Sequence, residues 1–300
     1  MSRKNYTRWL GALLALGRVM SGDAASFGTG ANAFELTFQP ISSTSNPSDE
    51  HPYGQVGYDY GIGTYEITAS QWAKYVNLSG GPSGNARAEP TTTGSEAVNY
   101  TSWDEAAQFV NWLNTSSGYA PAYNFSDEGA FSVWSAEEQS DTSAFRHKDA
   151  IYVLPSEDEW VKAAYWSGTE LQQHATPEVI EMTDMMVNSL IDGGIWEVGS
   201  GSMELNGTYD MMGNVWELTE SAYVGPDENS WQNRSARGGS YGYGYDESSL
   251  TLDSGRCSEY SGNEKINFGF RVAAVPEPGS IALLGLFGGG IVWVRRVFMM

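Results

Sequence analysis

Two carboxylates and two flexible backbone positions occur within eight residues and can hold a cation together. Asp210 and Glu217 supply hard oxygen ligands, and Gly213 and Val215 between them can turn backbone carbonyls toward the same point. Oxygen ligands of this kind suit Ca²⁺. The pattern therefore predicts a structural calcium site at these four residues. The alternative is that Glu217 only satisfies loop amides beneath Trp216.

The chain has few cysteines and histidines that could take part in catalysis or bind a metal ion. Its one cysteine, Cys257, allows no intramolecular disulfide, and a lone thiolate makes a poor copper site. We expect Cys257 to be a small buried or half-buried residue. The sequence supports no Ser/His/Asp triad and no pair of catalytic carboxylates. Iron is not expected either, because it needs clustered imidazoles and the histidines are scattered at His51, His147 and His174.

Three helices that would position these residues are predicted from their caps. The first follows Thr68 and covers 69–76, with Trp72, Tyr75 and Val76 on one face. The other two begin with capping boxes, in which a serine is followed three residues later by a glutamate. These boxes are Ser102 with Glu105 and Ser156 with Glu159, and apolar stripes follow both.

The rest of the chain consists of short aromatic and β-branched fragments separated by glycine. With 35 glycines and 13% aromatic residues, this composition predicts one domain with few short strands, held together by burial of Trp and Tyr. We place the domain at residues 32–274. The polar, acidic segment 114–150 is predicted to be an insertion, and 170–200 is left unassigned.

Four motifs occur in the order and spacing of one known family. They are Tyr152–Trp160, Tyr209–Leu218 with its Gly-Asn-Val-Trp-Glu core, Arg237–Tyr241 and Asn267–Arg271. On these motifs the chain resembles the formylglycine-generating, or sulfatase-modifying factor, family over most of residues 56–274. The resemblance implies an α+β fold related to C-type lectin domains, with little regular secondary structure. It also implies calcium at the positions that match the predicted set, and structural roles for Arg237 and Arg271, although either arginine can also line the cleft.

The catalytic centre of this family uses two cysteines near the C-terminus, which hold copper and activate oxygen. The spacing of Arg256 and Gly269 matches the family, and this register implies that the two cysteine positions fall on Tyr245 and Leu250. Neither side chain binds copper, and Cys257 lies off both positions. We therefore predict no catalytic residue and no copper.

Both ends of the chain resemble targeting segments. Basic residues precede the apolar run 9–16, and small residues follow, which predicts a signal peptide over 1–25. The alternative is an amphipathic first helix. At the other end, Pro276-Glu277-Pro278, an apolar run and Arg295-Arg296 resemble a PEP-CTERM sorting signal over 275–300. This resemblance implies an exosortase-type enzyme that removes the tail in a Gram-negative bacterium that produces exopolysaccharide. An ordinary C-terminal membrane anchor is the alternative.

The charge of the chain excludes some partners. The net charge is −21, and without the terminal segments the body has 10 basic and 35 acidic residues. Such a surface repels nucleic acid. Three functions remain. The first is a non-catalytic exported domain that binds extracellular polysaccharide or a surface protein through Tyr241, Tyr243 and Tyr245. The second is an oxidoreductase or other protein-modifying enzyme that uses the family cleft, and the third is a structural component of an extracellular matrix.

Overall fold

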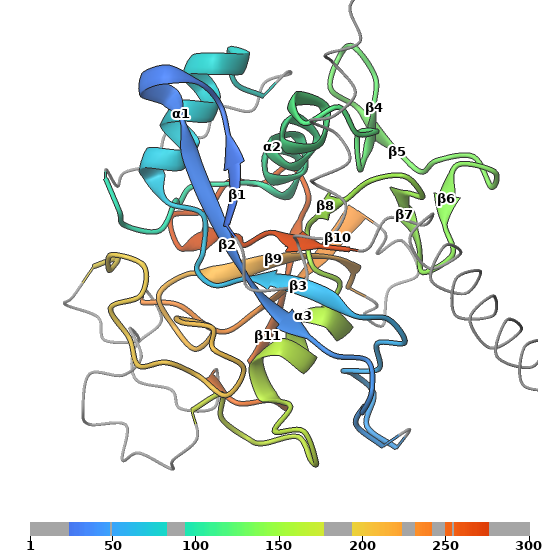
Figure 1. The fold of residues 1–300 in the computed structure, drawn as a ribbon, viewed down its shortest axis with the longest axis vertical. Helices are drawn as coiled ribbons and strands as arrows, with labels where there is room; N and C mark the ends of the chain where they lie inside the picture. Colours follow the sequence, from blue (N-terminus) through green and yellow to red (C-terminus); the bar gives the residue numbers. More distant parts are fainter. Residues whose placement is uncertain are drawn as a thin grey trace, which may run out of the picture.

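Two β-sheets form the framework of the domain (Figure 1). The computed structural model describes residues 24–48, 50–82, 94–176, 194–223, 232–241, 250–253 and 255–275. The first sheet has the order β1–β2–β3–β13–β8, with β1 at Ala24–Phe27, β2 at Phe34–Ile41, β3 at Tyr60–Gly63, β13 at Ala273–Ala274 and β8 at Tyr152–Val153. The second has the order β11–β10–β9–β12, with β11 at Arg256–Tyr260, β10 at Asn233–Arg237, β9 at Trp216–Ala222 and β12 at Phe268–Gly269.

The C-terminal segment 268–274 joins the two sheets. It contributes β12 to the second sheet, parallel to β9, and β13 to the first, antiparallel to β3 and β8. Many of the strands have only two to five residues. The predicted α+β fold with little regular secondary structure is confirmed.

All three predicted helices are present and begin where their caps predict. They are α1 at Ala69–Ser79, α2 at Trp103–Ser116 and α3 at Glu157–Tyr165. Each has a complete capping box, in which the cap side chain and the third helical side chain satisfy one backbone N–H of each other. A short 3₁₀ turn, η2, covers Gly30–Asn32. The helix starts are thus determined by local sequence.

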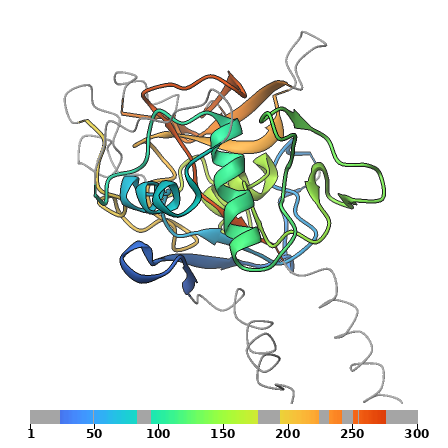
Figure 2. The ribbon, with the colours of Figure 1, turned by 90° about the horizontal axis from the view of Figure 1, so that it is seen from above.

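The helices α2 and α3 each contact both sheets. α2 packs against β8 and β9, and α3 packs against β3, β9 and β10. Figure 2 shows α2 between the sheet that contains β2 and the sheet that contains β9 and β10. The hydrophobic core therefore lies between the two sheets, around these helices.

Aromatic rings fill much of this core. Trp72 of α1 stacks on Phe109 of α2 with ring centres 5.8 Å apart, and Phe109 meets Phe270 edge-on at 5.5 Å. All three side chains are buried. Burial of one large apolar side chain contributes about 1.5–3 kcal/mol, so rings such as these supply much of the stability that the short strands lack.

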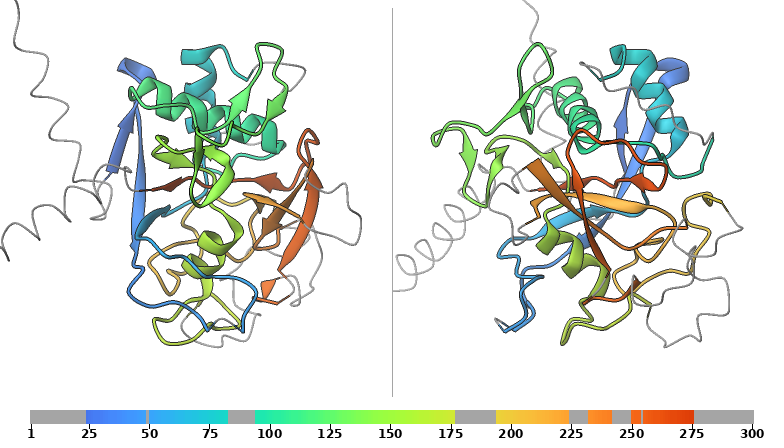
Figure 3. Two further views of the ribbon diagram at one scale, coloured as in Figure 1. Left: turned by 90° about the vertical axis from the view of Figure 1, so that its right-hand side faces the viewer. Right: turned by 180° about the vertical axis from the view of Figure 1, so that it is seen from behind.

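The segment 114–150, which was predicted to be an insertion, packs into the domain. Two hairpins from this segment lie beside α2 (Figure 3), and Arg146 on the second hairpin is only 2% exposed. Its guanidinium donates to Glu159 of α3 and to Glu220 of β9. The hairpins pair β4 (Asn124–Phe125) with β5 (Phe131–Ser132) and β6 (Gln139–Ser140) with β7 (Ser143–His147).

The described body begins before the predicted domain start at residue 32. Ala24 and Ala25 in β1 pair with β2, and Phe27 is buried. Cleavage after Ala25 would therefore divide β1. The segments 1–23 and 276–300 lie outside the described residues, so the signal peptide and the sorting signal stay predictions. Among the residues that the structure describes, no helix has the length and apolar character to cross a membrane.

Candidate functional site

The loop at residues 209–217 holds two non-glycine residues in the left-handed backbone region. Asp210 has a φ of 60° and Asn214 a φ of 54°. Asp and Asn are among the few non-glycine residues that adopt this conformation as single residues, and neighbouring contacts hold it here. The Asp210 carboxylate accepts the backbone N–H groups of Gly199 and Gly201 at 2.5 and 3.1 Å. These bonds fix the loop at its first end.

Glu217, at the other end of the loop, forms a buried ion pair with Arg271. The guanidinium donates to both carboxylate oxygens at 2.5 and 2.6 Å, and the Trp160 indole donates to one of them at 2.8 Å. Arg271 also donates to the carbonyls of Gly63 and Tyr209, at 2.9 Å each. Its predicted role as a core arginine that satisfies loop carbonyls is confirmed. The partners of Glu217 are a guanidinium and an indole, which neither sequence-based alternative named.

Two more buried carboxyl groups, Glu66 and Glu204, lie in the surroundings of this ion pair. Oε1 of Glu66 accepts a hydrogen bond from Asn214, and Oε2 is buried without a hydrogen-bond partner in the described part of the chain. Burial, and then the charges of Asp210 and Glu217, raise the pKa of Glu66 well above its ordinary value. Burial raises the pKa of Glu204 to about 8. Glu204 is therefore mainly protonated at neutral pH.

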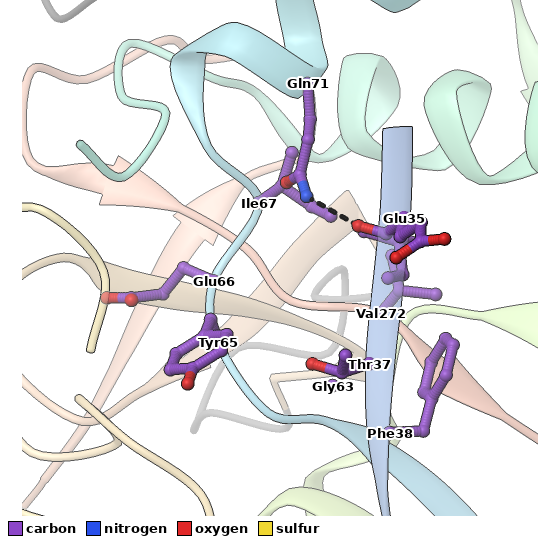
Figure 4. A pocket seen from close by; sticks show the side chains of 10 residues that line it. Glu35, Thr37, Phe38, Gly63, Tyr65, Glu66, Ile67, Gln71 and Val272 are labelled. Carbon is purple, nitrogen blue, oxygen red and sulfur yellow. Dashed lines mark hydrogen bonds between the residues drawn. The ribbon is translucent and has the colours of Figure 1, made fainter. Parts of the chain in front are cut away.

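A small hollow beside Glu66 is too small for an organic ligand. Its volume is about 40 Å³, which is close to the space of one water molecule. Figure 4 shows that Gln71 donates to the Glu35 carbonyl of β2 there, at 3.0 Å, while the Glu66 carboxyl group points away from β2. The hollow is thus a packing feature rather than a binding site.

Calcium at Asp210, Gly213, Val215 and Glu217 stays a prediction, and the contacts of its two carboxylates do not favour it. The Asp210 oxygens accept hydrogen bonds from backbone N–H groups, and the Glu217 oxygens accept hydrogen bonds from the Arg271 guanidinium. Within the described ranges, no three His, Cys, Asp or Glu residues are placed to hold a metal ion.

Removal of divalent cations tests the calcium prediction directly. We expect the thermal unfolding midpoint to be the same with EGTA as with CaCl₂, because the carboxylates have protein partners. A bound ion would stabilise the folded state by mass action. A fall of the midpoint in EGTA that CaCl₂ reverses, and MgCl₂ does not, would show that the folded protein binds calcium and would contradict this expectation.

The positions that the family's cysteines would take offer no thiol in the described chain. Leu250 is fully buried, and its carbonyl accepts the Tyr165 hydroxyl at 3.3 Å. Tyr245 lies outside the described residues. Cys257 on β11 is half-buried as predicted, and burial raises the pKa of its thiol to about 12. A thiol with this pKa is protonated at neutral pH and is a poor metal ligand and nucleophile.

Arg237 is the second confirmed core arginine. It is fully buried on β10, and it donates to Glu157 of α3 at 2.7 Å and to the Leu252 carbonyl at 3.0 Å. Arg256 of β11 donates to the same Glu157 carboxylate at 2.6 Å. The motif arginine therefore connects α3 to the second sheet.

A partly exposed group of side chains, which we call the tyrosine face, consists of Tyr100, Tyr241 and Ile266. Tyr100 and Tyr241 are half-exposed, and Ile266 is 50% exposed. The Tyr241 hydroxyl donates to the Ile266 carbonyl at 3.3 Å, and its backbone N–H donates to the Asn214 carbonyl at 3.0 Å. Asn99 donates to the same Ile266 carbonyl at 2.8 Å. These bonds hold the Tyr241 ring in place at the surface.

The sequence located part of the tyrosine face and missed part of it. Tyr241 was predicted, whereas Tyr243 and Tyr245 lie outside the described residues. Tyr100 was not predicted. It has a φ of 55° and lies near enough to Tyr241 to raise its pKa, together with burial, which is the larger cause. No sequence signal marks Tyr100, because its neighbour is far along the chain.

Comparison with known proteins assigns the chain to a family. The model of the FGE-sulfatase family, described as the sulfatase-modifying factor enzyme 1-like domain, matches residues 41–275. This chain belongs to that family. A search of curated proteins found no match.

Solved structures share the fold of this chain. One is Treponema denticola variable protein 1, with a TM-score of 0.61 and 21% identity over 84% of this chain and 99% of that one. A second is CarF, with a TM-score of 0.57 and 21% identity over 80% and 98%. A third is PvdO from Pseudomonas aeruginosa, with a TM-score of 0.54 and 16% identity over 84% and 98%. At these identities the likeness establishes the fold and no activity.

Proposed function

We propose that this protein is exported and binds an extracellular ligand, a polysaccharide or a surface protein, through the tyrosine face. The observation that carries the proposal is the way Tyr241 is held. Its ring is half-exposed, while Ile266 and Asn214 fix its hydroxyl and its backbone. A ring fixed before binding offers apolar area and a polar edge, and it loses little conformational freedom when a ligand docks.

A role without the family's copper chemistry is supported by the side chains near the expected centre. Copper(I) selects thiolates, and activation of oxygen in this family needs two of them. Leu250 is a buried apolar residue, and the raised pKa of Cys257 keeps its thiol protonated. Leu250, at one of the two expected thiol positions, serves packing.

Export and surface sorting rest on the two terminal segments. A signal peptide over 1–25 would direct secretion, and the Pro-Glu-Pro tail over 275–300 would be removed by an exosortase-type enzyme. The protein would then remain at the cell envelope or extracellular surface. The strongly acidic body excludes nucleic acid as a partner.

Two other functions stand beside this one. The first is an enzyme that modifies a protein through other residues of the family cleft. The second is a structural component of an extracellular matrix, which would need no ligand at the tyrosine face. The experiment below separates both from the binding role.

The full chain is incubated with a Cys-x-Pro-x-Arg peptide and copper. In a separate assay its binding to an array of bacterial polysaccharides and envelope proteins is measured. We expect no aldehyde in the peptide, and retention on the array that Tyr241→Ala weakens about tenfold, since a stacked aromatic ring contributes about 0.5–1.5 kcal/mol beyond its buried area. Mass spectrometry detects the aldehyde, and surface plasmon resonance measures the retention.

The controls make each result decisive. A family member with both cysteines must form the aldehyde under the same conditions, and exposed Val133→Ala, outside the tyrosine face, must bind as the wild type does. Aldehyde formation by this chain would overturn the non-catalytic proposal. Retention that Tyr241→Ala leaves unchanged would exclude the tyrosine face, and no retention would favour the matrix role.

A further inference from the structure

A second hollow lies at the end of β9 that is remote from the tyrosine face. Its volume is about 600 Å³, within the range of small-ligand sites. Gln55, Gly57, Thr142 and Ala144 on its walls are exposed, so it opens to solvent. The β6–β7 hairpin, seen in Figure 3, supplies one wall. The lining consists of residues 55–58, residues 142–145, Ser156 and Asp158 at the start of α3, and residues 220–222 of β9.

The carboxylate at the base of the hollow is held rigidly. Oε2 of Glu220 accepts a hydrogen bond from Nε of Arg146 at 2.8 Å and another from the Tyr123 hydroxyl at 3.0 Å. Arg146 is in turn bound by both carboxylate oxygens of Glu159 at 3.0 Å. Tyr58, another wall residue, donates to Glu159 at 2.5 Å. Neither Glu220 nor Arg146 can turn toward a ligand without breaking these bonds.

The charge of the walls opposes anionic ligands. Asp158 and Glu220 both line the hollow, and none of the described residues that line it is a lysine or an arginine. The nearest guanidinium, Arg146, is only 2% exposed and is used by Glu159 and Glu220. A phosphate or an acidic sugar would therefore meet two carboxylates, and the guanidinium beside them is already held by Glu159 and Glu220.

Hydroxyl groups on the same walls supply hydrogen-bond donors. The side-chain oxygens of Ser143, Ser156 and Ser221 each accept one backbone N–H, at 3.2, 3.1 and 2.9 Å. An oxygen that accepts in this way keeps its own proton for donation. The walls thus place three hydroxyl donors next to the carboxylate acceptors of Asp158 and Glu220.

A ligand that matches these walls must carry both hydrogen-bond donors and acceptors, and the carboxylates oppose a negative charge on it. An ammonium group is donor-only, so it would use the carboxylates and leave the hydroxyl protons without acceptors. The hydroxyls of a sugar do both, and the half-exposed Phe145 adds an aromatic surface for the apolar face of a sugar ring. We infer that this hollow binds a neutral saccharide unit.

This site is separate from the tyrosine face, and the two are tested by different variants. In the full chain, kept in a sugar-free detergent, saturation-transfer NMR is measured with neutral glucan, mannan and galactan tetrasaccharides. Oligogalacturonate serves as the anionic probe and a chitosan tetramer as the amine probe. Ala144→Trp fills the hollow from an exposed wall position, and Asp158→Asn removes a charged acceptor. Ala130→Trp, at an exposed position outside the lining, is the matched control.

We expect at least one neutral tetrasaccharide to bind. Ala144→Trp should abolish this signal and Asp158→Asn should weaken binding about tenfold, while Ala130→Trp and Tyr241→Ala leave it unchanged. Binding that survives Ala144→Trp would place the sugar elsewhere and overturn the inference. Binding of only the anionic or only the amine probe, or of none, would overturn the ligand class. Circular dichroism and the unfolding midpoint of each variant show whether it is folded.

Discussion

Replacing Arg271 by methionine is expected to lower the free energy of unfolding by about 3–5 kcal/mol, because it leaves a carboxylate buried without its partner. Glu217 is 1% exposed, and Arg271 supplies two of the hydrogen bonds to its oxygens. The carbonyls of Gly63 and Tyr209 lose a donor in the same variant. Such a loss is a large part of the total stability of a domain, which is about 5–15 kcal/mol. Urea denaturation followed by tryptophan fluorescence measures the change.

A double variant separates the buried charge from the lost packing. In Arg271→Met combined with Glu217→Gln, no charge is left buried, and the glutamine carbonyl can still accept from Trp160. The double variant should therefore be more stable than Arg271→Met alone. Lys148→Ala removes an exposed hydrogen bond to the Glu137 carbonyl and should cost less than about 1 kcal/mol. If Arg271→Met costs no more than Lys148→Ala, the ion pair does not hold the loop.

The elements with local signals were predictable from the sequence. Ser102 and Ser156 each stand three residues before a glutamate, and both helices begin there. These contacts lie within one turn of helix, so the types of a few neighbouring residues are enough to predict them. The roles of Arg237 and Arg271 were implied by their motifs, and both are buried in the core.

The contacts that the sequence did not reveal join distant segments. Arg146 appeared to belong to a polar insertion, because its partner Glu220 lies 74 residues away. A single arginine in a polar segment has the same local pattern whether it is solvated or buried against a carboxylate. Strands of two residues, such as β8 and β12, are equally invisible, since they are too short for an alternating pattern.

The candidate site was predicted in part for the same reason. Asp210 and Glu217 were predicted to be calcium ligands, and the protein partners that their carboxylates have in the structure come from outside the motif. Gly199 lies 11 residues from Asp210, and Arg271 lies 54 residues from Glu217. A motif shows which groups are present, whereas the fold decides whether a carboxylate meets a metal ion or a guanidinium.

The pH dependence of stability should change strongly when Glu204 is made unable to ionise. Glu204 is 4% exposed, and its carboxyl group accepts from the Thr208 hydroxyl at 2.9 Å. Burial raises its pKa from 4.5 to about 8, and the neighbouring carboxylates Asp210 and Glu217 add to this rise. The folded state therefore holds the proton more tightly than the unfolded chain does. The contribution of Glu204 to the free energy of unfolding is fully present below about pH 4.5 and is lost as the pH rises through 8.

Because each pH unit of difference corresponds to about 1.4 kcal/mol, the loss amounts to roughly 4–5 kcal/mol across this window. In Glu204→Gln the group stays neutral at every pH, so the stability of the variant relative to the wild type should rise between about pH 5 and 8 and level off above pH 8. Urea denaturation at several pH values measures that difference. Glu137→Gln removes one negative charge at an exposed position and should give a nearly flat difference. A flat difference for Glu204→Gln as well would mean that Glu204 ionises inside the folded protein without cost, and that the charges around Arg271 are balanced in another way.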